Sequence, residues 1–444
     1  MIDADLIIRN IRELVTCAGP APLAGSRQRE VGPLHDATIA SLRGRIVYAG
    51  GAREAVSALA PTPDARIIDA SAMSVVPGFV DPHTHLVFAG DRRDELRRRL
   101  AGATYAEIAA AGGGIVSTVT ATRAAAEDDL IRQGLGRLDE MLACGTTTCE
   151  VKSGYGLDLE SELKMLRAAA RLDEAHAMDV VLTFLGAHEV PPEYRGRRSD
   201  YVKLLIDHMI PEVARTNAAE WCDVFCEEGV FTPEESTRIL EAGVAHGLKP
   251  RIHADELGAS GGSQVAAHVR ARSADHLIYV QSDGIEAMAR AGVTATLLPN
   301  AAFYLKLGRF APARALIDAG VPVALATDVN PGGGFSPSMP FAMSIACFQM
   351  HMTFEEALAA ATLNAAWSID RSEDVGSLEK GKVMDAVLVH GDAVNLIRNG
   401  APSIAAVVKR GRIVHGGITG DQGDKQEIRR SGDTKGLMKG PGRE

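Results

Sequence analysis

The chain of 444 residues has few cysteines and no long apolar run, and these absences narrow its class. Its six cysteines show none of the paired spacing of a zinc ribbon, so we expect reduced, partly buried thiols without assigned chemistry. No apolar stretch approaches the roughly 20 residues that cross a bilayer. The start, Met1-Ile2-Asp3-Ala4-Asp5, lacks the basic-then-apolar plan of a signal peptide. The sequence therefore predicts a cytoplasmic protein with no membrane partner.

The charged fraction is near average, but positive side chains are fewer than negative ones. Forty-seven Lys and Arg residues stand against 57 Asp and Glu, which gives a net charge of -10. This balance argues against nucleic acid as a partner and favours a small-molecule substrate. The glycine run Gly112-Gly113-Gly114 lacks the strand and helix context of a nucleotide-binding loop, so we expect no nucleotide site there. The apolar content of 46% is enough for one large domain and a smaller one.

Short apolar segments broken by turns occur at both ends of the chain and predict β-strands. These segments are residues 5–8, 36–40, 45–50, 66–69, 385–390, 404–408 and 411–415. We expect residues 1–74 and 376–418 to pair into one small, discontinuous β-sandwich domain. Residues 420–444 have almost no apolar side chains, which predicts a disordered tail.

Residues 75–375 alternate between short apolar strands and Ala-, Leu-, Arg- and Glu-rich helical stretches, a pattern typical of parallel strands with helices outside. Strands are predicted to start near Phe79, Thr146, Val180, Cys222, Arg251, Ser273, Thr294 and Val323. Helices are predicted at 160–177 and 233–246, with N-terminal starts at Asp158 and Thr232. The expected fold class is α/β, with a (β/α)₈ TIM barrel at this length.

His83 and His85 directly follow an apolar run. Residues two apart on a strand point to the same face, so both imidazoles can share one metal ion. His253 and Asp328 follow other apolar runs, and barrel enzymes carry their chemistry at the C-terminal ends of their strands. Three imidazoles and one carboxylate suit Zn²⁺ or Fe²⁺ and leave a position for water. We expect hydroxide formed on the ion to be the nucleophile, with Asp328 taking the proton.

Longer segments around these residues carry a family resemblance. They run from His83 to Arg92, Lys152 to Leu157, Phe184 to Tyr194, Ala274 to Leu277 and Thr327 to Gly332. From about residue 5 to 415 the chain resembles the amidohydrolase superfamily and, within it, the imidazolonepropionases of histidine degradation. The resemblance implies hydrolysis of 4-imidazolone-5-propanoate to N-formimidoyl-L-glutamate.

The resemblance also implies the remaining site residues. His276 is expected to be catalytic, by polarising the ring oxygen or moving a proton, while Glu256 would accept a ring N–H or pass a proton. His188 would contact the ring, and Tyr155 would contact substrate or product. Arg92 is expected to bind the propanoate carboxylate, because a planar guanidinium matches a carboxylate.

The segment after Asp328 resembles a loop whose backbone N–H groups approach the substrate. Asn330, Gly332 and Gly333 are the residues expected to bind there, since glycine permits close contact. This chain departs from many relatives, which place hydroxyl residues after Asn-Pro-Gly where it has Gly333 and Gly334. A side-chain donor is thereby lost, so carboxylate binding would depend more on Arg92.

Several alternatives remain open from the sequence. Related binuclear hydrolases bridge two ions with a carbamylated lysine. In that arrangement Lys152 would be the bridge and His276 a ligand of the second ion; the alternative is an ion pair between Lys152 and Glu150 or Glu189. Another mononuclear amidohydrolase, such as a cyclic-amidine or nucleobase deaminase, would use the same ligands but would not need Arg92 and the Asn330 loop to recognise a carboxylate. A non-catalytic scaffold of the same fold is disfavoured because all four metal ligands are present. A homodimer is expected, as is common for such barrels.

Overall fold

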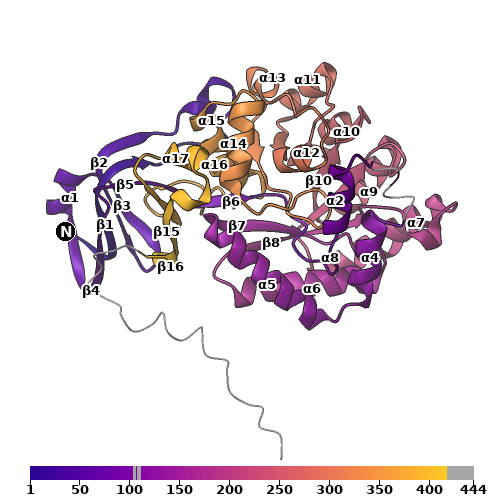
Figure 1. Cartoon of the computed structure of the whole chain (residues 1–444), viewed down its shortest axis with the longest axis horizontal. Helices are drawn as coiled ribbons and strands as arrows, with labels where there is room; N and C mark the ends of the chain where they lie inside the picture. The colour runs from indigo at the N-terminus through magenta and orange to yellow at the C-terminus, as the bar shows by residue number, and fades with distance from the viewer. Residues whose placement is uncertain (104–106, 108–111, 418–444) are drawn as a thin grey trace, which may run out of the picture.

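The computed structural model describes residues 1–103, 107 and 112–417 (Figure 1). The tail predicted for residues 420–444 lies outside the described residues. Two eight-stranded sheets organise the chain: a parallel sheet curled into a barrel, and a mixed sheet formed by the two ends of the chain. In Figure 1 the mixed sheet lies to the left of the barrel.

The barrel strands follow one another in chain order, each parallel to the next. They are β6 (Phe79–Asp81), β7 (Thr146–Lys152), β8 (Asp179–Ala187), β9 (Trp221–Cys226), β10 (Lys249–Ala254), β11 (Ser273–His276), β12 (Thr294–Leu297) and β13 (Val323–Leu325). Each begins within two residues of its predicted start, so the predicted barrel is confirmed.

Helices separate and cover these strands. They are α2 (Arg93–Leu100), α4 (Ile115–Ala124), α5 (Glu127–Ala143), α6 (Leu159–Ala175), α7 (Arg198–Leu204), α8 (Ile210–Arg215), α9 (Pro233–Ala245), α10 (Gly262–His268), α11 (Ser282–Ala291), α12 (Pro299–Tyr304), α13 (Ala313–Asp318), α14 (Met339–Gln349), α15 (Phe354–Ala361) and α16 (Leu363–Ser368). Among the described residues, none of the helices combines the length and apolar character that a membrane span requires.

Two helices begin where their capping residues predict. Asp158 accepts a hydrogen bond from Ser161 N at 2.8 Å at the start of α6. Thr232 and Glu235 form a reciprocal capping box at the start of α9. Each cap satisfies one or more N–H groups that the first helical turn leaves without partners, which fixes where the helix starts.

The barrel closes between its first and last strands just beyond their ends. In the part of the chain that the structure describes, β6 and β13 share no strand ladder. Instead, Asp328 N donates to His83 O at 3.1 Å and His85 N donates to Val329 O at 3.0 Å. The segments that carry three of the four predicted metal ligands are therefore held side by side.

The mixed sheet joins both ends of the chain. Its strands are β1 (Ile2–Val15), β2 (Pro33–Leu42), β3 (Arg45–Gly51), β4 (Leu59–Asp69), β5 (Met73–Pro77), β14 (Ala386–His390), β15 (Ile404–Lys409) and β16 (Arg412–Gly416), with the short helices α1 (Ala52–Ala58) and α17 (Asn395–Arg398). The ends meet where β5 pairs with β14, and one apolar core contains side chains from both, including Ile8, Val75 and Leu388.

The apolar run before His83 is divided between the two sheets. Residues up to Pro77 pair with β14 as part of β5, whereas Phe79 begins β6 in the barrel. Gly78 lies at the crossing, where a Cβ atom would overlap the side chain of Thr147. This crossing carries the chain directly from the terminal sheet to the mouth of the barrel.

Candidate active site

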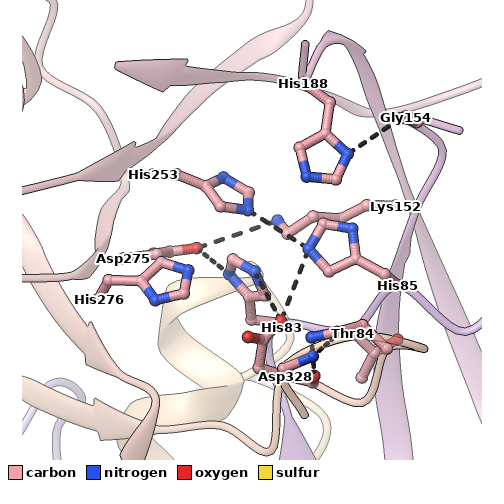
Figure 2. A network of polar contacts seen from close by, with 12 residues as sticks. His83, Thr84, His85, Lys152, Gly154, His188, His253, Asp275, His276 and Asp328 are labelled. Carbon is pink, nitrogen blue, oxygen red and sulfur yellow. Dashed lines mark hydrogen bonds and ion pairs between the residues drawn. The ribbon is translucent and has the colours of Figure 1, made fainter. Parts of the chain in front are cut away.

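The four predicted metal ligands meet at the mouth of the barrel (Figure 2). One ring nitrogen from each of His83, His85 and His253 lies within 4.8 Å of the other two. The Asp328 Oδ1 atom is 3.7 Å from His83 Nε2 and 3.6 Å from His85 Nε2. All four side chains are buried. Residues up to 245 positions apart in the sequence thus form one cluster, the His₃Asp cluster.

Two buried carboxylates determine which ring nitrogens face the His₃Asp cluster. His83 Nδ1 donates to Asp275 Oδ2 at 2.6 Å, and His253 Nδ1 donates to Asp223 Oδ1 at 3.1 Å. A neutral imidazole carries one proton, so Nε2 of each ring presents a lone pair. Carboxylates that hold imidazoles in this way orient metal ligands in proteins.

The atoms that face the cluster fit a divalent metal ion. Within the described residues, the buried atoms His83 Nε2 and Asp328 Oδ1 make no hydrogen bond. Burial raises the pKa of the Asp328 carboxyl to about 8 and holds the pKa values of His83 and His85 well below the usual range. A carboxylate and imidazole lone pairs that converge in a buried site are costly without a partner, and a cation that takes nitrogen and oxygen ligands satisfies all of them.

Lys152 lies beneath the cluster as an ion-paired ammonium group. Its Nζ is 2.8 Å from Glu150 Oε1 and 2.8 Å from Asp223 Oδ2. Burial disfavours the charged form, but Asp223 and Glu150 hold the Lys152 pKa above its usual value. The predicted pair with Glu150 is present, and the second partner is Asp223 rather than Glu189. An ammonium held by two carboxylates does not support the carbamylated bridge between two ions.

Asp275 supports the cluster indirectly, and Asp275→Asn tests this support. Asp275 Oδ2 accepts from both His83 Nδ1 and Arg251 Nη2, the latter at 3.2 Å. An amide oxygen carries less charge, so we expect affinity for Zn²⁺ to fall roughly 10–100-fold in a chelator competition. Asp283→Asn, at an exposed site, is the control. Unchanged affinity in Asp275→Asn would show that His83 does not depend on this carboxylate.

His276 and Asp328 leave their strands with left-handed backbone, at φ values of 75° and 55°. Residues other than glycine seldom adopt this conformation, and it is often found at functional sites. The His276 ring lies 5.3 Å from the His253 ring between centroids, and its Nδ1 lies 3.6 Å from Glu256 Oε1. Burial, with Asp328 and Glu227 nearby, holds the pKa of Glu256 well above its usual value.

His188 and Tyr155 form an aromatic wall beside the cluster. The His188 ring stacks on His85 with centroids 4.9 Å apart and planes 17° apart. His188 Nδ1 donates to Gly154 O at 2.9 Å, which leaves its Nε2 as an acceptor. Burial lowers the pKa of His188 to about 3, so the ring is neutral.

A buried carboxylate that the sequence analysis did not single out holds the Tyr155 loop. Glu162 accepts hydrogen bonds from the backbone N–H groups of Gly154, Gly156 and Leu157, at 2.7–3.2 Å. In the sequence, Glu162 looks like an ordinary solvent-exposed glutamate in the first turn of a helix. Its role follows only from the way the loop folds back over the helix.

A pocket of about 420 Å³ opens from the His₃Asp cluster. All the predicted catalytic and substrate-binding residues line it: Arg92, Tyr155, His188, Glu256, His276, Asp328, Asn330, Gly332 and Gly333. Arg99, Phe225 and Leu305 line it as well and were not predicted. Arg99 occurs in an arginine-rich stretch whose surface and pocket members look alike in the sequence.

The loop after β13 requires a correction. The N–H groups of Gly332 and Gly333 donate to Asn330 Oδ1 at 2.8 and 2.7 Å, so they do not point toward a substrate as predicted. Asn side chains commonly fold back on the backbone that follows them. Asn330 Nδ2 also donates to Asp328 O at 2.7 Å. The loop therefore supports Asp328 from behind, while both glycines still line the pocket.

The barrel fold and the residues at the mouth of the barrel define a metal-dependent hydrolase of the amidohydrolase type. The model of the amidohydrolase family matches residues 74–421. Among solved structures, the guanine deaminase of E. coli superposes with a TM-score of 0.68 at 16% identity, covering 93% of this chain and 99% of that one. At this identity the likeness concerns the fold alone.

Sequence comparison narrows the class. The imidazolonepropionase of Geobacillus kaustophilus (strain HTA426) is 50% identical over 414 residues, which cover 92% of this chain and 97% of the relative. That of Geobacillus thermodenitrificans (strain NG80-2) is 50% identical over 416 residues, with the same coverage. The chain therefore belongs to the amidohydrolase family and, within it, to the imidazolonepropionases.

Proposed function

We propose that this protein hydrolyses 4-imidazolone-5-propanoate to N-formimidoyl-L-glutamate. The observation that carries the proposal is that three members of the His₃Asp cluster, His85, His253 and Asp328, line one pocket together with the buried Arg92. A cyclic amide with a carboxylate arm suits this combination, whereas a neutral nucleobase has no use for the arginine. In the reaction, water oxygen bonds to the ring carbonyl carbon, the adjacent C–N bond breaks, and the nitrogen gains a proton.

We infer one divalent ion, Zn²⁺ or Fe²⁺, with His83, His85, His253 and Asp328 as its ligands. When bound, the ion supplies a Lewis acid for the ring carbonyl and lowers the pKa of water. Asp328 accepts a proton from the attacking water. Its carboxylate belongs to the cluster and faces the pocket, so the same group can then deliver the proton toward the departing nitrogen.

Glu256 and His276 can act on the oxygen or the nitrogen of the scissile amide. Their side chains lie 3.6 Å apart on the pocket wall, and both favour neutral forms because of burial. A neutral carboxyl donates a hydrogen bond to a developing oxyanion or a proton to nitrogen. His188, with Nε2 as an acceptor, receives a ring N–H and so orients the ring.

Arg92 binds the propanoate carboxylate. Arg92→Ala should raise KM by a factor that corresponds to about 1.5–3 kcal/mol, the loss expected for a charged hydrogen bond, with a smaller change in kcat. Arg97→Ala is the matched control, because Arg97 lies on the same helix but is exposed and pairs with Asp94. A KM that does not change in Arg92→Ala would remove Arg92 from the site.

The proposal is tested by assaying the purified protein on 4-imidazolone-5-propanoate while its bound metal is quantified. We expect formation of N-formimidoyl-L-glutamate and about one divalent ion per chain. Absence of turnover in protein reconstituted with Zn²⁺ and with Fe²⁺ would refute the function. Two ions per chain would refute the single-metal site. The homodimer and the cytoplasmic location stay predictions.

A further inference from the structure

The guanidinium of Arg92 is held in a fixed frame at the pocket wall. Arg92 Nε and Nη2 donate to Glu95 Oε2 at 2.9 and 2.8 Å. Glu95 lies three residues further along, in the first turn of α2, and both side chains are buried. One carboxylate oxygen thus holds one edge of the guanidinium.

The second oxygen of Glu95 is also engaged. Glu95 Oε1 accepts from Gly114 N at 2.9 Å, at the residue that precedes α4. Gly114 has φ 81°, a left-handed conformation that favours glycine. The glycine run noted in the sequence therefore has a structural use here, since its last member ties Glu95 to the next helix. Glu95 cannot turn without losing one of its two attachments.

Gly332 forms the other side of the frame. A Cβ atom at this position would overlap Nη1 and Cζ of Arg92, so the guanidinium lies directly against the Gly332 backbone. Within the described residues, Arg92 Nη1 makes no hydrogen bond. Because Arg92 lines the pocket, the N–H groups left over are those available to a ligand carboxylate.

We propose that Glu95 is a positioning residue that holds Arg92 in the orientation that selects ligands with a carboxylate arm. This inference rests on the proposed function for its choice of ligand. An arginine already confined to one orientation loses little freedom when it binds, and its planar N–H edge then favours a carboxylate over a neutral amide. Without Glu95, Arg92 would keep its charge but lose this alignment.

The experiment measures binding rather than turnover, on the metal-loaded protein. The probes are imidazole-4-propanoate and imidazole-4-propanamide, which share one ring, so ring contacts cancel in the ratio of their Kd values. In Glu95→Gln, a single amide oxygen cannot accept from both Arg92 and Gly114, and the NH₂ group faces a donor. We expect the preference for the acid over the amide to fall roughly tenfold or more.

A second variant tests the orientation of Arg92 from the other side of the guanidinium. Gly332→Ala leaves Glu95 intact but places a methyl group where the Arg92 guanidinium lies, so the same preference should fall. Asp94→Asn is the matched control, because it removes an exposed pair with Arg97 on the same helix and should leave the ratio unchanged. Thermal unfolding of each variant verifies that a folded protein is compared.

The outcomes separate this inference from the proposed function. A wild-type protein that does not prefer the acid overturns the inference, and so does an unchanged ratio in both Glu95→Gln and Gly332→Ala. A higher ratio in Glu95→Gln also overturns it, because Glu95 would then act only by repelling the ligand carboxylate. Turnover of 4-imidazolone-5-propanoate is assayed separately, and its absence refutes the proposed function while the binding ratio still decides the role of Glu95.

Discussion

His83→Ala should yield a folded protein that neither retains a divalent ion nor opens the imidazolone ring. In the unaltered protein, Asp275 directs the Nε2 lone pair of His83 into the cluster. Removing this imidazole leaves two imidazoles and one carboxylate. We expect kcat to fall at least about 10³-fold, since a catalytic ion supplies several kcal/mol. Asp275 keeps Arg251 as a partner at 3.2 Å, so the fold should survive. Metal analysis, circular dichroism and the ring-opening assay measure the three effects.

His268→Ala is the control for this variant. His268 lies at the end of α10, its side chain is 67% exposed, and it pairs only loosely with Glu241 at 3.7 Å. It should retain full metal content and activity. Full metal content in His83→Ala would instead refute the proposed set of ligands, whatever the activity.

The barrel was predictable because its signals are local. Each strand is a short apolar segment bounded by turns, and capping residues such as Asp158 and Thr232 mark where helices start. The division of the apolar run at Gly78 was not predictable in this way. Residues on both sides are equally apolar, and only the pairing of β5 with β14 decides which sheet each half joins.

The metal ligands were predictable from the sequence, whereas the carboxylates that orient them were less so. His83, His253 and Asp328 were recognisable because ligand residue types follow apolar strands. The carboxylates Asp223 and Asp275 stand inside such strands, and a buried acid there is itself a signal of a partner.

The use of the loop amides was mispredicted for a physical reason. Glycines after Asn330 suggest open backbone N–H groups, but the Asn330 side chain is a closer acceptor than any ligand. In the same way, the frame of Arg92 depends on Gly114 and Gly332, which are distant in sequence from one another. Contacts of this kind follow from tertiary structure rather than from local pattern.

Asp328→Asn should abolish most of the turnover while it leaves more metal bound than His83→Ala does. The amide can still offer an oxygen to the ion, and the three imidazoles are unchanged, but an amide does not accept a proton from water. We expect kcat to fall roughly 10²–10⁴-fold, the range for loss of a general base. The measurement is kcat per bound ion, after reconstitution with Zn²⁺, so that partial metal loss is corrected for.

The stability of the metal-free variant separates a catalytic role for Asp328 from a structural one. Burial raises the pKa of this carboxyl to about 8, so the charged form is costly without the ion, and a neutral amide should not lower the Tm of the metal-free protein. Asp370→Asn is the matched control, since Asp370 pairs with Lys249 at 2.6 Å at the start of β10, on the opposite end of the barrel. It should lower Tm and spare kcat. If Asp328→Asn retained more than about a tenth of kcat per ion, the proton would have to leave by another group, and Glu256 would be the next to test.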